Sequence, residues 1–443
     1  MLIRFIVSNF LSFNEETEFN MLTGNFKIHK SHVIRTHKID LLKTAAIYGA
    51  NGSGKSNLIK AVEMLKNLAT STDDPLKTSI TRCFKLEENC QQKPSSFEVE
   101  FVAQNKIFSY GLSFLNKVIT EEYLYKKTKE GNDELVFERK LTNGVRKIEM
   151  NPKLTSNEKD RYYIELFEEE LLKDNQTFLS QAKGKRFKDI NLVYEWFDDY
   201  LIVIFPQSKY MSMLHQIVDN LNFKEFVTSV IKNVDTGIQD LASKEIPYDS
   251  FFGEDEKSVK EDILKQLEED KNSAIVLQNE VSEAVISKSE SGKPIVHKLI
   301  TRHPTSKGQL IDFEITEESD GSRRLLDIIP ALDVVFNMNA TVFIDEINRS
   351  MHPSMTKELI ILFLLNEASK GQLIFTTHES NLLDLKLFRP DEIWFTEKKD
   401  DGSTTMYPLS DFKPRYDLDI RKGYLQGRFG AIPFLGNLKD LNW

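Results

Sequence analysis

An eight-residue run in the first part of the chain carries the clearest chemical pattern. It reads Gly-Ala-Asn-Gly-Ser-Gly-Lys-Ser over residues 49–56 and matches the phosphate-binding pattern G-x-x-x-x-G-K-[ST]. Glycines let a backbone loop wrap around phosphate oxygens, because their dihedral angles are the least restricted. We expect Lys55 to reach the β- and γ-phosphates of a nucleoside triphosphate and the Ser56 hydroxyl to ligate Mg²⁺. The residues expected to bind the nucleotide are Gly49, Asn51, Gly52, Ser53, Gly54, Lys55, Ser56 and Asn57.

The segments on both sides of this run suit a phosphate site. Residues 44–48 are a short apolar run typical of a buried strand. Apolar residues from Leu58 to Ala69 recur at spacings of three and four, which predicts a helix that begins at Lys55. A helix N-terminus behind a glycine loop presents backbone N–H groups and the positive end of its dipole to an anion. A glycine-rich turn without a ligand is the alternative, and the complete match in this setting favours the phosphate site.

A pair of carboxylates forms the second candidate group. Residues 341–344 are Thr-Val-Phe-Ile, suited to a buried parallel strand, and Asp345 and Glu346 follow them directly. In this Walker B pattern we expect Asp345 to hold Mg²⁺ and Glu346 to orient and polarise the attacking water. Adjacent acids after an apolar run are common by chance. The distance of 290 residues from Lys55 (345 − 55) indicates a large insertion rather than a minimal P-loop protein.

Two further segments flank the carboxylates. An apolar strand over residues 373–377 ends at His378, and ligands collect at such strand ends in α/β sheets. Upstream, Ser319 is suited to cap a helix and Gly321 permits close approach, so this helix N-terminus is a second candidate anion site. A structural histidine and an ordinary capped helix are the alternatives. The order of the segments around the carboxylates favours a functional role for both.

Composition is that of an ordinary globular protein and restricts the class of partner. The chain has 443 residues, 40% apolar and 28% charged, with a formal net charge of −10. This acidic balance argues against general nucleic-acid binding. No apolar run approaches the roughly 18 residues needed to span a membrane. Cys83 and Cys90 have neither a disulfide-framework nor a zinc spacing, so we expect free thiols and a cytoplasmic location.

The N-terminal third of the chain is expected to be rich in β-structure. Residues 2–8 and 17–21 predict two strands that pair, and residues 97–103 and 107–114 predict an antiparallel hairpin. Strand-like patterns continue to about residue 140. The sequence therefore predicts a small antiparallel sheet beside the nucleotide core.

The stretch 26–43 is polar and is expected to be a solvated loop. Three histidines lie in it, in a spacing that fits no common metal motif: His29, His32 and His37. Helical periodicity dominates from about residue 155, with a short strand at 201–205 and two short helices over 209–233. Residues 260–286 predict one longer amphipathic helix, which we expect to pack on the core rather than to serve as a partner-binding arm.

These segments together resemble the motifs of ABC-type ATPases. The order of carboxylate strand, helix and histidine strand is similar, and residues 319–323 resemble a divergent signature motif, S-x-G-x-x in place of LSGGQ. The whole chain looks like the ABC-type AAA ATPases related to RecF, SMC proteins and OLD nucleases, in particular the stand-alone bacterial group found in abortive-infection and anti-phage systems. The resemblance is weak over 125–300, and Leu11 stands where RecF and SMC proteins often carry Lys or Arg. Other supporting segments are 9–13, 347–353, 391–395 and 424–433.

The resemblance implies an α/β fold: an ABC-type P-loop ATPase core, with a mixed or parallel sheet flanked by helices, an antiparallel β subdomain and a helical insertion. It divides the chain into an N-terminal ATPase lobe (1–150), a mainly helical insertion (151–300) and a C-terminal lobe with signature, Walker B and switch histidine (301–443). It also implies slow, Mg²⁺-dependent hydrolysis of ATP. The residues expected to carry catalysis are Lys55, Glu346 and His378.

The function implied is an ATP-driven switch that controls a partner effector, such as a Toprim nuclease, in anti-phage defence. The resemblance further implies a homodimer or higher homo-oligomer with ATP at the interface, where Ser319 and Gly321 contact the γ-phosphate of the opposite subunit. Only 53 residues follow Pro390 (443 − 390), too few for a fused Toprim domain, so we expect any nuclease to be a partner. The alternative is a RecF-like DNA clamp in repair or recombination, although only weak DNA binding is expected. The large insertions and divergent signature disfavour a transporter's nucleotide domain.

Overall fold

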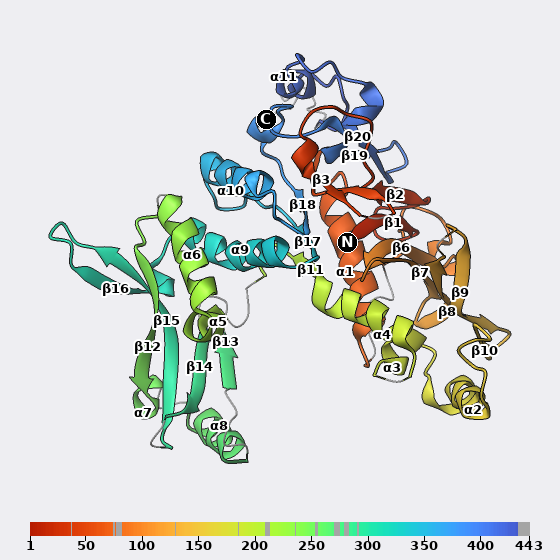
Figure 1. Cartoon of the computed structure of the whole chain (residues 1–443), viewed down its shortest axis with the longest axis horizontal. Coiled ribbons are helices and arrows are strands. Elements are labelled where there is room, and N and C mark those ends of the chain that lie inside the picture. Colours follow the sequence, from red (N-terminus) through yellow and green to blue (C-terminus); the bar gives the residue numbers. More distant parts are fainter. Residues whose placement is uncertain are drawn as a thin grey trace, which may run out of the picture. The chain divides into compact units, whose positions relative to one another are not determined.

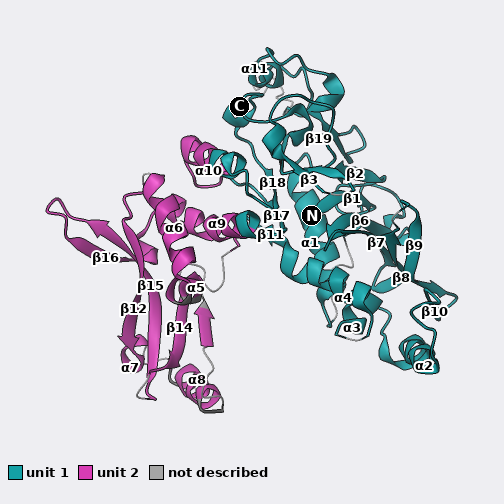
Figure 2. Cartoon of the chain, in the orientation of Figure 1, with its two compact units in different colours: residues 1–206, 335–347, 361–443 teal, residues 207–334, 348–360 magenta. Residues whose placement is uncertain are grey.

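The structure, a computed structural model, shows two compact units, whose elements appear in Figure 1 and whose extents appear in Figure 2. Unit 1 comprises residues 1–206, 335–347 and 361–443, and unit 2 comprises residues 207–334 and 348–360. The division into 1–150, 151–300 and 301–443 stays a proposal about domain organisation. The described residues are 1–36, 38–73, 76, 82–128, 130–184, 186–208, 213–234, 236–252, 256–269, 275–278, 283–289 and 292–432.

The phosphate-binding run lies on a six-stranded sheet of unit 1, in the order β11-β17-β18-β5-β19-β20 (Figure 1). All neighbouring pairs are parallel except β19 with β20. The carboxyl ends of parallel strands meet at one edge of a sheet, so the segments that follow β5, β17 and β18 come together there. The strands are β5 (Thr44–Gly49), β11 (Leu201–Ile204), β17 (Thr341–Ile344), β18 (Gln372–Thr376), β19 (Ile393–Lys398) and β20 (Thr404–Pro408).

The predicted helix after the glycine loop is confirmed as α1 (Lys55–Thr70). Its apolar face is buried, because residues at helical spacing point together toward the sheet. The buried apolar residues of α1 include Leu58, Val62, Leu65 and Ala69. The other helices that contribute to unit 1 are α2 (Glu158–Leu166), α3 (Phe178–Ala182), α4 (Lys188–Glu195) and α11 (Ile420–Leu425), together with the ends of α9 (Asp320–Asn337) and α10 (Pro353–Leu365).

A second sheet of unit 1 is wholly antiparallel, with seven strands in the order β10-β9-β8-β7-β6-β1-β2. The predicted pairing of the first two strands and the predicted hairpin are confirmed. One hydrophobic cluster joins this sheet, α1 and the core sheet, with Phe101 stacked on Trp196 at 3.9 Å between ring centres. The strands are β1 (Leu2–Ser8), β2 (Thr17–Asn20), β6 (Ser95–Ala103), β7 (Lys106–Leu115), β8 (Val118–Lys127), β9 (Asp133–Thr142) and β10 (Val145–Met150).

The expected solvated loop at 26–43 is wrong for much of its length. Strands β3 (Val33–Arg35) and β4 (Asp40–Leu42) pair within it. His32 is buried, and its Nδ1 lies 3.0 Å from both carboxylate oxygens of Glu392. A buried carboxylate requires a hydrogen-bonding partner, and this one comes from a segment 360 residues away. His37 lies outside the described residues, among which no cluster of His, Cys, Asp and Glu could hold a metal ion.

The expectation of free thiols is also wrong, because Cys83 and Cys90 form a disulfide. The Asn9 side chain holds both ends of the intervening turn. It accepts from the Phe84 N–H at 3.2 Å and donates to the Cys90 carbonyl at 3.0 Å. The two cysteine Cα atoms are thereby 5.8 Å apart, within the range that a disulfide bridges.

Unit 2 contains a sheet in the order β12-β15-β14-β13, with β16 paired to β15. The two predicted short helices are confirmed as α5 and α6, but the single helix expected over 260–286 is wrong. Helix α8 ends at Glu269, and β13 and β14 follow it. β14 has alternating apolar residues and pairs with β15. The local apolar spacing suits a helix as well as a strand, and pairing with a distant segment selects the strand. The bounds are α5 (Met213–Asp219), α6 (Leu221–Asn233), β12 (Asp240–Pro247), α7 (Tyr248–Phe251), α8 (Lys257–Glu269), β13 (Ile275–Gln278), β14 (Glu283–Lys288), β15 (Pro294–Pro304) and β16 (Leu310–Glu314).

None of the helices in the described part of the chain is both long enough and apolar enough to cross a membrane.

Candidate nucleotide site

The loop between β5 and α1 has a backbone that only glycine adopts easily. Gly54 has a φ of 112°, and a Cβ placed on it would lie 2.1 Å from the Oγ1 atom of Thr404. A Cβ on Gly49 would lie 2.3 Å from Thr396 Oγ1. Strands β19 and β20 therefore press against the loop from behind. The glycines serve both the loop's dihedral angles and this close packing.

Lys55 is the buried cation of the site. It is 5% exposed, and its Nζ donates to the carbonyls of Gly49 at 2.8 Å and Ala50 at 3.0 Å. Burial lowers the pKa of Lys55 to about 8, although the negative charges of Asp345 and Glu346 act in the opposite direction. The Lys55 side chain is thus protonated at neutral pH. Its ammonium group lies against the loop that would also bind the phosphate oxygens.

The Walker B carboxylate meets the P-loop helix through direct hydrogen bonds. Ser56 Oγ donates to Asp345 Oδ1 at 3.1 Å, and Thr376 Oγ1 donates to the same oxygen at 2.6 Å. Asp345 is 3% exposed. A hydroxyl and a carboxylate oxygen side by side are suitable Mg²⁺ ligands, since Mg²⁺ is typically held by few protein oxygens together with phosphates and water. The donor set of Ser56 and Asp345 therefore fits the expected metal.

Glu346 has an unusual backbone that Thr376 stabilises. Its φ is 49°, a left-handed value that is uncommon for a residue with a side chain. The Glu346 N–H donates to Thr376 Oγ1 at 2.7 Å, and the Ile347 N–H donates to the Thr376 carbonyl at 3.1 Å. One hydroxyl thus contacts the Asp345 side chain and the Glu346 backbone. Such backbone strain is concentrated at functional sites, where it fixes the direction of a side chain.

Thr376 is the site residue that sequence reasoning missed. Its neighbour Phe375 pairs with Ile344 in the parallel ladder, which places Thr376 beside Asp345. The signal in the sequence is a hydroxyl residue at the end of the strand that neighbours the Walker B strand. That signal becomes useful only when the two strands are known to be adjacent and in this register.

His378 follows two residues after Thr376 and lies within electrostatic reach of the site. Partial burial lowers its pKa, the positive charge of Lys55 lowers it further, and Glu346 and Asp345 act in the opposite direction. Part of the side chain nevertheless remains accessible to solvent. The structure thus brings Lys55, Ser56, Asp345, Glu346 and His378 together in unit 1.

Two expected nucleotide contacts have other partners in the structure. The Asn57 side chain donates to Ser12 Oγ at 2.8 Å, and Ser53 Oγ lies 2.6 Å from Thr396 Oγ1. Thr404 Oγ1 lies 2.8 Å from both Ser12 Oγ and the Ser53 carbonyl oxygen. The segment 9–13, which supported the family resemblance, is thereby attached to the P-loop and its helix. Asn51 and Gly52 are exposed in the loop.

The signature-like segment belongs to unit 2. Ser319 Oγ accepts from the Ser322 N–H at 3.1 Å, which confirms the predicted helix cap. Asp320 forms an ion pair with Arg323. A Cβ on Gly321 would lie 2.8 Å from the Ser350 carbonyl oxygen. The close approach at Gly321 is therefore to a backbone segment of the same chain, a contact that the sequence did not indicate.

A parallel sheet whose strand ends carry a P-loop, adjacent carboxylates and a histidine defines the P-loop class of ATPases, and the predicted α/β fold class is confirmed. The model of the family described as "AAA domain, putative AbiEii toxin, Type IV TA system" matches residues 45–384. The match covers well over half of the chain, and the chain belongs to this family. Membership implies the use of a nucleotide and Mg²⁺.

Solved structures similar to the chain include heads of SMC proteins. The SMC head domain from Thermotoga maritima is 12% identical, with 92% of this chain and 98% of that chain covered and a TM-score of 0.39. An SMC head bound to the C-winged helix domain of ScpA is 12% identical, with 93% and 99% covered and a TM-score of 0.40. An SMC head with an extended coiled coil, bound to the C-terminal domain of ScpA and derived from Pyrococcus furiosus, is 12% identical, with 93% and 97% covered and a TM-score of 0.39. No curated protein matches the chain.

Proposed function

We propose that this chain binds ATP with Mg²⁺ and hydrolyses it slowly, as a molecular switch. The observation that carries the proposal is the convergence of Ser56 and Thr376 on one oxygen of Asp345, beside the buried ammonium group of Lys55. These are the groups needed to hold a triphosphate and its metal at the N-terminus of a helix. Membership of a family of AAA domains supports the same activity.

Each residue has a separate task in the proposed reaction. Lys55 and the loop N–H groups bind the β- and γ-phosphates, and Ser56 and Asp345 would hold Mg²⁺, which neutralises charge on the phosphates. Glu346 orients a water molecule and polarises it by accepting a hydrogen bond from it. The water oxygen forms a bond to the terminal phosphorus while the bond from that phosphorus to the bridging oxygen breaks. His378 contacts the γ-phosphate, where negative charge must be stabilised.

We also propose that the switch acts as a homodimer or higher homo-oligomer and controls a protein effector, such as a Toprim nuclease, in anti-phage defence. The capped helix at Ser319 would then meet the γ-phosphate bound to the opposite subunit. The family description names a toxin of a type IV toxin–antitoxin system, and this supports a role in a two-gene defence system. The net charge of −10 favours a protein partner over broad DNA binding.

Two substitutions test the ATPase proposal by separating binding from turnover. Lys55→Ala removes the counter-charge of the γ-phosphate and is expected to abolish ATP binding in a calorimetric titration. Glu346→Gln keeps the shape of the side chain, so ATP is expected to bind with Mg²⁺ while phosphate release falls by at least about a hundredfold. Tight ATP binding by the Lys55→Ala protein would sink the assignment of the P-loop.

A further inference from the structure

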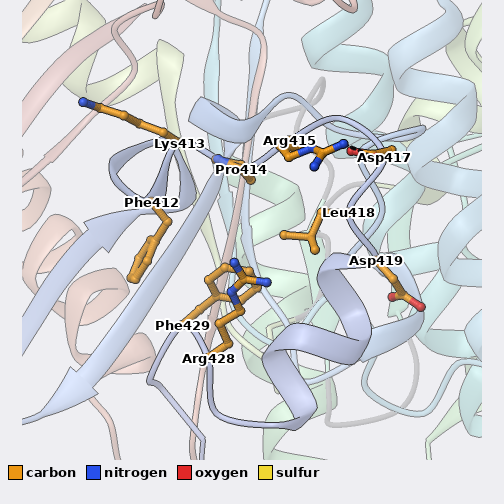
Figure 3. Close-up of a pocket in the computed structure, with 9 residues that line it drawn as sticks. All are labelled: Phe412, Lys413, Pro414, Arg415, Asp417, Leu418, Asp419, Arg428 and Phe429. Carbon is orange, nitrogen blue, oxygen red and sulfur yellow. Dashed lines mark hydrogen bonds and ion pairs between the residues drawn. The ribbon is translucent and has the colours of Figure 1, made fainter.

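A hollow of about 550 Å³ opens at the C-terminal part of unit 1 (Figure 3). It lies between the segment that follows the short 3-10 helix Leu409–Phe412 and the turn that follows α11. Its size is that of a small-molecule or side-chain pocket. The apolar side chains that line it are Phe412, Pro414, Leu418 and Phe429. The nucleotide site uses none of these residues, although the sequence around Phe429 supports the family resemblance.

The turn over residues 427–431 is fixed by hydrogen bonds from its surroundings. Tyr407 OH donates to the Phe429 carbonyl at 2.9 Å, and Tyr424 OH donates to the Ala431 carbonyl at 3.2 Å. The Ala431 N–H donates to a Glu397 carboxylate oxygen at 3.3 Å. The turn therefore presents its side chains from a rigid backbone.

Phe429 connects the wall of the hollow to the core sheet. It is 2% exposed, and its ring stacks on Phe395 of β19 with 6.0 Å between ring centres. Phe395 stacks on Tyr424 at 5.6 Å, and Tyr424 packs edge-on against Tyr48, the residue before the P-loop, at 6.2 Å. Because this aromatic cluster fixes the wall, the hollow is already formed and a ligand need not order it. Such pre-formation lowers the entropic cost of binding.

Arg428 is a cation of the hollow that pairs with no carboxylate of the described residues. It is exposed, and its guanidinium lies over the Phe429 ring, 6.0 Å from the centroid. Among the described residues, the Arg428 guanidinium has no ion-pair or hydrogen-bond partner. Figure 3 shows Arg428 next to Phe429 with Leu418 above them, whereas Lys413 points away from the other side chains.

The charge around the hollow is positive, in contrast to the chain as a whole. Three of the four nearby acids are engaged. Asp417 pairs with Arg415 at 3.1 Å, Asp419 accepts from the Lys422 N–H at 2.9 Å to cap α11, and Glu397 accepts from Tyr407 OH and the Ala431 N–H. Phe412 is 43% exposed and offers an apolar surface beside these cations. The charged residues of 411–428 are Asp411, Lys413, Arg415, Asp417, Asp419, Arg421, Lys422 and Arg428.

We propose that this hollow docks an acidic segment of a partner protein. One apolar side chain of that segment enters the hollow and packs against Phe412 and Leu418, and a neighbouring carboxylate pairs with Arg428. An apolar pocket with one unpaired guanidinium suits a peptide better than a nucleic-acid strand, which requires a row of cations along its backbone. The proposal concerns a surface outside the nucleotide site, and it stands whether or not the chain hydrolyses ATP.

Fluorescence anisotropy with the full chain tests the proposal. The probe is a fluorescein-labelled peptide, Asp-Glu-Phe-Asp-Glu-Leu. The control peptide has the same sequence with lysine at every acidic position. We expect the acidic peptide to bind and the basic one not to bind. Arg428→Ala is expected to lower the affinity for the acidic peptide by about tenfold, which is the effect of losing one charge-assisted hydrogen bond. Phe412→Ser removes an apolar wall of the hollow and is expected to lower the affinity for the acidic peptide to a similar degree.

Arg421→Ala is the matched control, because Arg421 is an exposed cation on α11 that does not line the hollow. It should change the affinity by no more than about twofold, as for an exposed charge without a fixed partner. Equal binding of both peptides, or no effect of Arg428→Ala, would overturn the proposal. Tighter binding of a fluorescein-labelled thymidine 12-mer than of the peptide would overturn it in favour of nucleic acid. The Lys55→Ala protein should bind the peptide unchanged, which separates this proposal from the proposed ATPase function.

Discussion

At the scale of single residues, the hydroxyl of Thr376 links the groups that would perform hydrolysis. It contacts the Asp345 carboxylate and the Glu346 N–H. Outer contacts of this kind orient metal-binding carboxylates, and their loss typically costs activity rather than folding. Thr376 is therefore a positioning residue, and its contribution can be separated from those of Lys55 and Glu346.

Thr376→Val keeps the shape of the side chain and removes both hydrogen bonds. We expect Mg²⁺-dependent phosphate release to fall by about 10- to 100-fold, because both carboxylates lose their orientation. Thr44→Val is the matched control: Thr44 is buried in the same sheet, and its hydroxyl donates to the Leu373 carbonyl at 2.7 Å. Each variant should lose about 1 kcal/mol of stability in a denaturant titration, but only Thr376→Val should lose turnover. Equal turnover in the two variants would contradict the assigned role.

The pKa of Lys55 predicts how ATP affinity depends on pH. Burial lowers this pKa to about 8, so the free protein loses the positive charge as pH rises through that value. ATP affinity should therefore be highest below the pKa and fall by about tenfold between roughly pH 7 and pH 9, when a charged contact to phosphate is lost. The pKa of His378 is lowered, so its ring is already neutral throughout this range. Calorimetric titrations across the range check the prediction, and a flat profile would argue against Lys55 as the titrating group.

At the scale of elements, the glycine loop works because β20 lies directly behind it. Gly54→Ala introduces a Cβ 2.1 Å from Thr404 at a φ of 112°, so either the loop or the strand must move. We expect loss of ATP binding together with a lower midpoint in thermal unfolding. Gly144→Ala is the control, because Gly144 also has a positive φ, of 77°, but its Cβ would meet nothing within 4 Å. That variant should lose about 1–2 kcal/mol of stability and bind ATP normally.

At the scale of the whole molecule, the proposed homodimer predicts composite sites shared between subunits. One chain carries one P-loop, one pair of carboxylates and one signature-like segment. The mixing of two inactive variants tests whether these parts act across subunits. Lys55→Ala disables the P-loop. Ser319→Arg is chosen to disable the signature, because Ser319 is exposed, whereas any side chain at Gly321 would meet the Ser350 carbonyl of the same chain.

Each variant alone should be inactive, and their mixture should regain part of the wild-type phosphate release. The mixed dimer unites the intact P-loop of one subunit with the intact signature of the other. Loss of the Ser319 cap costs about 1 kcal/mol, so thermal unfolding of the Ser319→Arg protein serves as a control for its folding. If the variants exchange subunits and the mixture stays inactive, the signature acts within its own chain or has no role in hydrolysis.

The parts of the site that follow a local pattern are predictable from the sequence. Each of three motifs can be recognised within about ten residues: the glycine loop with Lys55, the strand before Asp345 and the strand before His378. Parallel strands collect their carboxyl ends at one edge, which is why local patterns were sufficient to predict that these groups meet. The helix that begins at Lys55 was predictable because its apolar residues recur at helical spacing within one short segment.

The contacts between distant segments follow from the folded arrangement and not from any local pattern. The role of Thr376 depends on the register of β18 against β17, and the support of the P-loop by Thr404 joins residues 351 apart. Likewise, residues 283–288 become a strand because β15 supplies a pairing edge, and residues 275–278 pair with them in turn, although the apolar spacing also suits a helix. Hydrogen bonds and packing depend on which segments become neighbours and in what register, and no local period carries that information.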